Sequence, residues 1–107
     1  MYFRRNLADI AGSHIPAKSQ NLLVVAYASL EGGSVTSNLR ARFSTDNGTT
    51  WTGPAILVSS TASEYGPRVA VNSQEVIWIT AGSQDTTWQS DSIVSHASPD
   101  GGTTWIS

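Results

Sequence analysis

The chain contains the same unit twice. Sliding the sequence by 54 residues aligns positions 11–51 with 65–105 without a gap, and ten of the 41 aligned pairs are identical. Apolar positions correspond as well, for example Leu22 with Val76 and Leu23 with Ile77. A unit of this length repeated in register is the signature of a repeat architecture, in which each copy buries its apolar surface against a neighbouring copy.

Each copy has the pattern of short strands separated by turns. Alternating or β-branched segments bounded by Gly, Asn, Ser and Pro are typical of antiparallel strands. The first copy predicts strands at 15–18, 21–28, 38–43 and 55–60, and the second at 67–72, 75–81 and 92–97. Four strands in about 40–50 residues is the size of one propeller blade. We therefore expect an all-β protein made of two four-stranded antiparallel blades.

The composition agrees with this fold and excludes several functions. The chain has 16 Ser, 11 Thr and nine Gly, and 13% of its residues are charged, which favours strands and turns over helices. A net charge of −2 argues against nucleic acid as a partner. Without cysteine, and with two distant histidines, we expect no metal and no cofactor. We also expect no membrane segment and no secretory signal, and hence by default a cytoplasmic location.

The repeat is out of phase with the ends of the chain. We treat residues 1–107 as a single unit, with the first repeat at about 11–64 and the second at about 65–107. Residues 1–10 align with 55–64, so we expect them to supply the fourth strand of the second repeat. Two blades cannot close a ring, and unpaired edges are a liability. Head-to-tail association of three chains would give a six-bladed homotrimer, which makes a second copy of the chain the first expected partner.

The aligned region of each repeat ends in one octet. The first octet is 44–51 (STDNGTTW) and the second is 98–105 (SPDGGTTW). A short acceptor such as Asp46 or Asp100 can bond backbone N–H groups inside the turn, Gly48 and Gly102 permit positive φ, and the tryptophan supplies a large anchor. These properties predict a structural turn. The eight positions with this role are Ser44, Asp46, Gly48, Trp51, Ser98, Asp100, Gly102 and Trp105.

The octets resemble the aspartate-box, or bacterial neuraminidase, repeat of sialidase-type β-propellers. Residues 13–27 are also similar to the opening blade of sialidases, in which an Arg-Ile-Pro tripeptide precedes a strand. In those enzymes the arginine binds the substrate carboxylate, and here His14 occupies its place, while the repeat partner of His14 is Arg68. The resemblance implies a six-bladed ring, with the octets away from the ligand. No catalytic residue of the family can be matched to this chain.

Three residues are candidates for ligand binding. Arg68 would lie on an innermost strand and could bind an anion or a sugar, or could instead pair with Glu64 or Glu75. His14 could act similarly or be a hydrogen-bonded channel residue. Trp88 could stack on a sugar, or could cover an adjacent blade. Adjacent Glu64 and Tyr65 have the groups of sialidase chemistry, but neighbours on a strand point to opposite faces.

These observations favour an oligomeric β-propeller binding module that recognises a carbohydrate or a small anion. One alternative is a glycoside hydrolase formed only in the assembled ring or in a longer parent chain. Glycosidases need two carboxylates in different environments around one bond, and identical copies around an axis do not supply them. We therefore favour binding over catalysis. The second alternative is a scaffold without a ligand.

Overall fold

The described residues of the computed structural model, 8–29, 38–58, 63–84 and 91–106, form two antiparallel sheets. The prediction of an all-β fold is confirmed. The four-stranded sheet has the order β1 (Ala8–Ile15), β2 (Gln20–Ser29), β3 (Asn38–Ser44) and β4 (Thr52–Val58). The three-stranded sheet has the order β5 (Ser63–Val71), β6 (Ile77–Gln84) and β7 (Asp91–Ser98). Each repeat thus builds one sheet.

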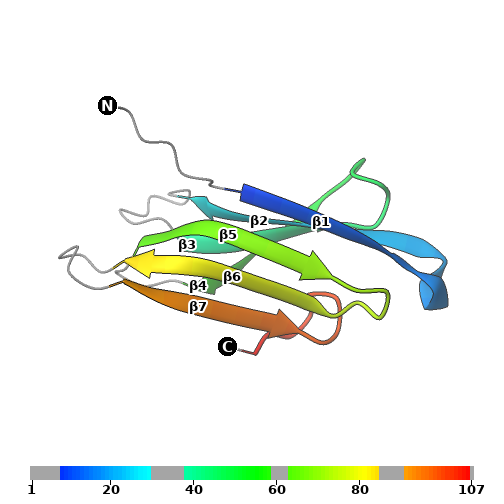
Figure 1. The fold of residues 1–107 in the computed structure, drawn as a ribbon. Helices are drawn as coiled ribbons and strands as arrows, with labels where there is room; N and C mark the ends of the chain where they lie inside the picture. Colours follow the sequence, from blue (N-terminus) through cyan, green and yellow to red (C-terminus); the bar gives the residue numbers. More distant parts are fainter. Residues whose placement is uncertain (1–7, 30–37, 59–62, 85–90, 107) are drawn as a thin grey trace.

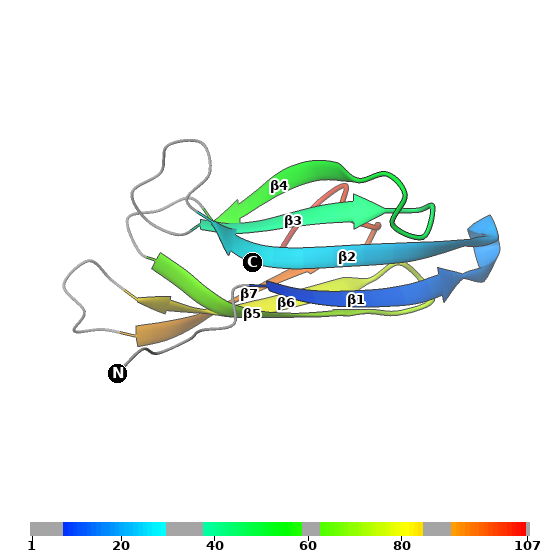
Figure 2. The same ribbon diagram turned by 90° about the horizontal axis from the view of Figure 1, so that it is seen from above.

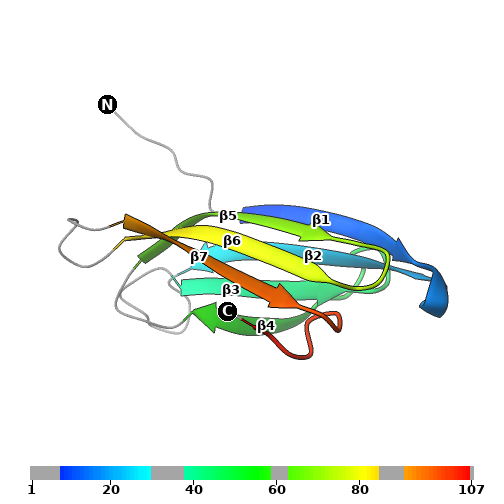
Figure 3. The ribbon, with the colours of Figure 1, turned by 60° about the horizontal axis from the view of Figure 1, so that its bottom comes forward.

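The two sheets are stacked face to face (Figures 1 and 2). The first strand of the second sheet, β5, packs chiefly against β1 and β2 of the first sheet. Strands that correspond in the repeat point in the same direction, β1 with β5 and β3 with β7 (Figures 1 and 3). The second sheet therefore follows the first as a copy stacked in the same orientation.

The core lies between the sheets and follows from strand alternation. In β2, Leu22, Val24 and Ala26 are buried, and in β6 Ile77 and Ile79 are buried. Successive side chains of a strand point to opposite faces, so one face of each strand enters the core. We call the face of each sheet toward the core its inner face and the opposite face its outer face.

The repeat in sequence is also a repeat in strand pairing. Leu23 of β2 pairs with Ser44 of β3, and 54 residues later Ile77 of β6 pairs with Ser98 of β7. The predicted strands at 21–28 and 38–43 correspond to β2 and β3. Those at 67–72, 75–81 and 92–97 correspond, with shifted ends, to β5, β6 and β7. The predicted strand at 55–60 corresponds to β4, which begins earlier, at Thr52.

The strand predicted at 15–18 is wrong, because Pro16–Lys18 form a 3₁₀ turn and the first strand precedes it. Proline has a fixed φ and no N–H to donate, so Pro16 suits the first position of a helical turn. In the second repeat the strand continues to Val71 and turns at Asn72, whose side-chain oxygen accepts N–H bonds from Gln74 and Val76.

This earlier turn changes which way the first strand faces. In the second sheet, Val71 of β5 pairs with Ile77 of β6. In the first sheet, the repeat partner of Ile77 is Leu23 of β2, and it pairs with Gly12 of β1. The repeat partner of Val71 is Ala17, so β1 is displaced by five residues relative to β5. An odd displacement exchanges the two faces of a strand.

At the position of a fourth strand in the second sheet, the described residues contain one pair of bridged residues. Ala97 of β7 and Ile106 exchange two backbone hydrogen bonds of 2.8 Å, in the place where Phe43 pairs with Thr52 in the first sheet. Of residues 1–10, which we expected in this position, 8–10 begin β1 and pair with β2. The expected pairing of residues 1–6 beside β7 lies outside the described residues.

Candidate functional site

The first octet is a turn closed by its own side chains. Oγ of Ser44 accepts the N–H of Gly48 at 2.9 Å and donates to Oδ1 of Asp46 at 2.8 Å. The same Oδ1 accepts the backbone N–H of Thr50 at 2.8 Å, and Oδ2 accepts the Thr50 hydroxyl. Gly48 has a φ of +87°, a conformation that glycine adopts without steric cost.

The second octet repeats this arrangement bond for bond. Ser98 bonds Gly102 and Asp100 at 2.8 and 2.9 Å, and Asp100 accepts the N–H of Thr104 at 2.8 Å. Gly102 has a φ of +100°. In both octets the acidic oxygens are occupied by the turn itself. This geometry suits Asp46 and Asp100 to holding the chain reversal and leaves them poorly placed to take a proton from a substrate.

The two aspartates are held in their charged form. Hydrogen bonds, the largest from the Thr50 hydroxyl, lower the pKa of Asp46 from 3.8 to about 2. The corresponding bonds from Thr104 lower the pKa of Asp100. Donors that point at a carboxylate favour the ionised form. A general acid needs the opposite shift, so the electrostatics also favour a structural role.

The two octet tryptophans differ in burial. Each ring nitrogen donates to the carbonyl of the octet glycine, at 3.0 Å for Trp51 and 3.2 Å for Trp105. Trp105 is half-buried and its ring centroid lies 6.3 Å from that of Phe43, on the other sheet. Trp51 is 38% exposed. Trp105 therefore fits the expected role of a large anchor better than Trp51, which no second sheet covers within the described residues.

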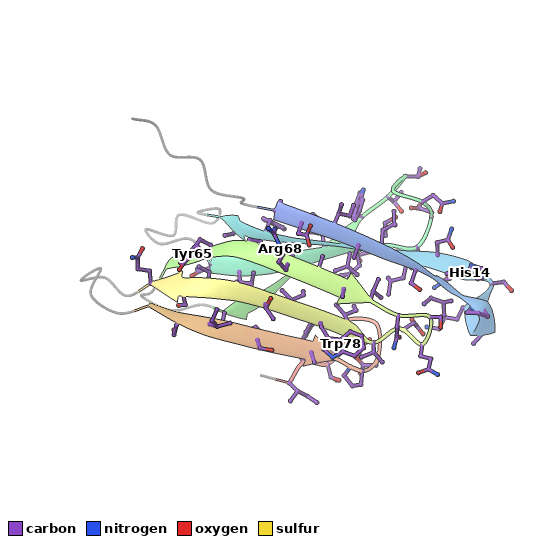
Figure 4. The ribbon with its side chains drawn as sticks, viewed as in Figure 1. His14, Tyr65, Arg68 and Trp78 are labelled. Carbon is purple, nitrogen blue, oxygen red and sulfur yellow. The ribbon has the colours of Figure 1, made fainter. Side chains whose placement is uncertain are left out.

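Arg68 lies in the middle of β5 and is exposed on the outer face of its sheet (Figure 4). Its cross-strand partner on that face is Thr80. Glu75 forms an ion pair with Lys18 at 3.0 Å, and Glu64 points to the inner face. Arg68 and Glu64 therefore lie on opposite faces of the sheet.

His14 lies at the far end of β1, away from Arg68 (Figure 4). Its Nδ1 is 2.9 Å from Oδ1 of Asn21, and Nδ2 of Asn21 donates to Oδ1 of Asn47 at 2.9 Å. The imidazole is thus tied to the first octet. Because β1 is displaced by an odd number of residues, His14 and its repeat partner Arg68 also lie on non-equivalent faces. Within the single chain, the two candidate residues therefore do not come together in one site.

Trp88 lies outside the described residues. An aromatic side chain that the sequence analysis did not single out, Trp78, is 46% exposed on the outer face of β6. It stands between Ala70 and Ala97, one row from Arg68 and Thr80 (Figure 4). The signal was present: in Ile77-Trp78-Ile79 the isoleucines enter the core, and alternation sends the tryptophan outward.

The Glu64 side chain is buried between the sheets, whereas the Tyr65 side chain lies on the other face of β5. Oε2 of Glu64 accepts the Ser83 hydroxyl at 3.0 Å, and Leu39 of the opposite sheet donates its backbone N–H to the carboxylate. Burial raises the pKa of Glu64, and these two bonds oppose the rise. Tyr65 lies on the outer face, where its ring fills the space over Gly82. As expected, the two side chains point to opposite faces, which separates the pair that a sialidase-type nucleophile would need.

A further buried titratable group, His96, faces the core from β7. Burial lowers its pKa. Its Nε2 has no hydrogen-bond partner among the described residues, and it pairs across the sheet with Ile79. Three or more side chains that could hold a metal ion do not come together in the described residues. No helix in the described part of the chain is long and apolar enough to span a membrane.

The outer face of the three-stranded sheet, with Arg68, Trp78 and Thr80, is therefore the surface where candidate binding residues lie together. Comparison of the chain with known protein families, with curated proteins and with solved structures finds no match.

Proposed function

We propose that this chain is the two-blade unit of a propeller-type binding module. Three chains associate head to tail into a six-bladed ring, and the ring binds a carbohydrate or a small anion near Arg68. The observation that carries the proposal is the stacking of two equivalent sheets with corresponding strands in the same direction.

Same-direction stacking favours continued assembly. Two units related by a rotation other than a twofold leave one unsatisfied face at each end, and further units can add there until the rotation closes. A compact assembly of about three times the 11.4 kDa chain mass is expected in sedimentation equilibrium. A ring of this kind would supply the neighbours that repeat units need to bury their outer faces.

The ligand proposal follows from the place of Arg68 in such a ring. The first strands β1 and β5 pack side by side, so in a ring of blades they are the strands nearest the axis. Arg68 lies on β5 and is exposed. Several guanidinium groups around one axis repel each other, and a bound anion relieves that repulsion. The planar guanidinium also suits carboxylates and phosphates through paired hydrogen bonds.

A thermal-shift series tests the ligand proposal. The melting temperature is measured with phosphate, sulfate and sialic acid at constant ionic strength, for the wild type and Arg68→Ala. A ligand that binds the folded protein at 100 times its dissociation constant stabilises it by about 2.7 kcal/mol, so a rise of several degrees is expected in the wild type. The rise should vanish in Arg68→Ala. Equal rises in both proteins would exclude Arg68 as the binding residue.

A further inference from the structure

We infer that the outer face of the three-stranded sheet binds the outer face of the four-stranded sheet in a second copy of this chain. This inference rests on the proposed assembly and specifies the surfaces that form it. It makes one chain contribute two different surfaces, one to each neighbour.

The outer face of the three-stranded sheet carries exposed apolar groups. Trp78 is 46% exposed and Ile93, on β7, is 78% exposed. The cross-strand neighbours of Trp78 are Ala70 and Ala97, so the indole stands above small side chains. Trp78 lies in one row of this face, and Ile93 lies two rows away, opposite Gly82 and beside the Tyr65 ring. Large exposed apolar side chains in separate rows of one sheet face suit an extended interaction surface.

The outer face of the four-stranded sheet is apolar near β1 and β2. Ile10 is 58% exposed and pairs with Val25, which is half-buried. In the next row Gly12 pairs with Leu23, and Leu23 fills the space above the glycine: a Cβ at Gly12 would lie 2.5 Å from its Cδ2. The result is a low apolar surface over β1 and β2.

The repeat shows why these two faces complement each other. Moving 54 residues along the chain converts Val24 and Ala26, on the inner face of the first sheet, into Trp78 and Thr80, on the outer face of the second. It also converts Leu23 and Val25, on the outer face of the first sheet, into Ile77 and Ile79, on the inner face of the second. The interface already present inside the chain is therefore made from two different faces of the repeated unit. The chain leaves one face of each kind open.

The internal interface supplies the pairing expected between copies. Val24 belongs to the same core cluster as Ile77 and Ile79. The equivalent contact between copies places Trp78 of one chain against Leu23 and Val25 of the next. Trp78 takes the place that Val24 has in the internal interface. Because the surface of Leu23 and Val25 is kept low by Gly12, the larger indole can lie against it and bury a large apolar area.

The cations of the two faces do not collide in this arrangement. Arg68 lies on the first strand of its sheet, whereas Arg40 and Arg42 lie on the third strand of the other. Strands are spaced about 4.8 Å apart, so when corresponding strands stack Arg68 is offset laterally from the other two by roughly 10 Å. The Nε of Arg42 also donates to the Tyr27 hydroxyl at 3.0 Å, which holds the guanidinium over its own sheet.

A mixing experiment with two variants tests the pairing of unlike faces. Trp78→Glu places a charge on the outer face of the three-stranded sheet, and Ile10→Glu does so on the four-stranded sheet. Both positions are exposed in the single chain, so both variants should fold, which circular dichroism and thermal melting check. Ala17→Glu, on the exposed turn after β1, is the matched control.

If unlike faces pair, each variant alone sediments at the 11.4 kDa chain mass, because each lacks one member of every pair. An equal mixture restores one intact interface, between Trp78 of one variant and the Ile10 face of the other. The mixture should therefore sediment at about twice the chain mass, and Ala17→Glu should retain the wild-type mass.

Other outcomes separate the interface from the assembly. If one variant alone still forms dimers, like faces pair by a twofold and the inference is wrong. If both variants assemble as the wild type does, the chain assembles through other surfaces, so the inference fails while the assembly stands. A wild type that remains at the chain mass at high micromolar concentration contradicts the assembly itself, and the inference with it.

Discussion

At the scale of single residues, the same motif has different consequences in its two copies. Trp51 and Trp105 end identical turns and bond their own glycine carbonyls. Trp105 also packs against Phe43 of the other sheet, with the rings inclined by 36°, whereas Trp51 is 38% exposed. The motif determines the turn, and the neighbouring sheet determines how much of the ring is buried.

Replacing the two tryptophans should therefore have unequal effects. Trp105→Ala removes a half-buried ring and its aromatic contact, and should lower the free energy of unfolding by about 2–3 kcal/mol. Trp51→Ala should cost about 1 kcal/mol, since much of this ring already meets water. Urea unfolding at one protein concentration measures both. In a double-mutant cycle with Phe43→Leu, only the Trp105 variant should show coupling, of about 0.5–1.5 kcal/mol; equal losses for the two variants would contradict this account.

At the scale of the turn, the octet makes the free energy of unfolding depend on pH in the acid range. The pKa of Asp46 is lowered from 3.8 to about 2, so its contribution is complete above pH 3.8 and is lost as the pH falls through about 2. We expect the free energy of unfolding of the wild type to fall between pH 4 and pH 2. Asp46→Asn should be less stable at pH 5 and lose less over the same interval. If Asp46→Asn has the wild-type slope, the turn bonds do not carry the effect.

At the scale of strands, much of the fold could be predicted because the repeat and the alternation act locally. The strands equivalent to β2, β3, β6 and β7 follow from apolar alternation between turn residues, and their pairing repeats at an offset of 54. The start of the first strand could not be predicted in this way. Pro16 begins the turn two positions before Lys18, the equivalent of Asn72, and pairing on the next strand begins at Gln20, three positions before Leu23, the equivalent of Ile77. Together these shifts displace the first strand by five residues, and an odd displacement exchanges the faces of a strand.

The candidate site was harder to predict for the same reason. Equivalence in sequence grouped His14 with Arg68, but the displaced β1 places them on non-equivalent faces, with His14 at the end of β1 and Arg68 in the middle of β5. Trp78 was missed because its repeat partner Val24 is a core residue. In a repeat protein, two equivalent residues of different chemical type indicate that their surroundings differ. Here Val24 lies in the core, whereas Trp78 lies on the outer face of the three-stranded sheet.

At the scale of the whole molecule, the two sheets are held together by an apolar core and a few polar contacts. Oδ2 of Asp9 accepts the backbone N–H of Val69 at 2.9 Å, and Lys18 pairs with Glu75 between two turns. Glu64 is the buried member of this set, with donors from both sheets. Its Oε1 is buried without a hydrogen-bond partner among the described residues. Ionisation of Glu64 therefore places a charge between the sheets on a carboxylate whose Oε1 has no partner among the described residues.

Glu64 should therefore oppose the octets in its effect on the pH dependence of stability. Burial raises its pKa above 4.5, so its contribution is complete below pH 4.5 and is lost as the pH rises through the higher value in the folded protein. Glu64→Gln, which resembles the protonated acid, should match the wild type near pH 4 and exceed it in stability at pH 7. Urea unfolding at both values measures the difference. Glu75→Gln, which removes the ion pair with Lys18 outside the core, should gain no stability at pH 7. If Glu64→Gln is less stable at pH 7, the ionised carboxylate holds the sheets together through its Leu39 and Ser83 donors, and burial is not the dominant effect.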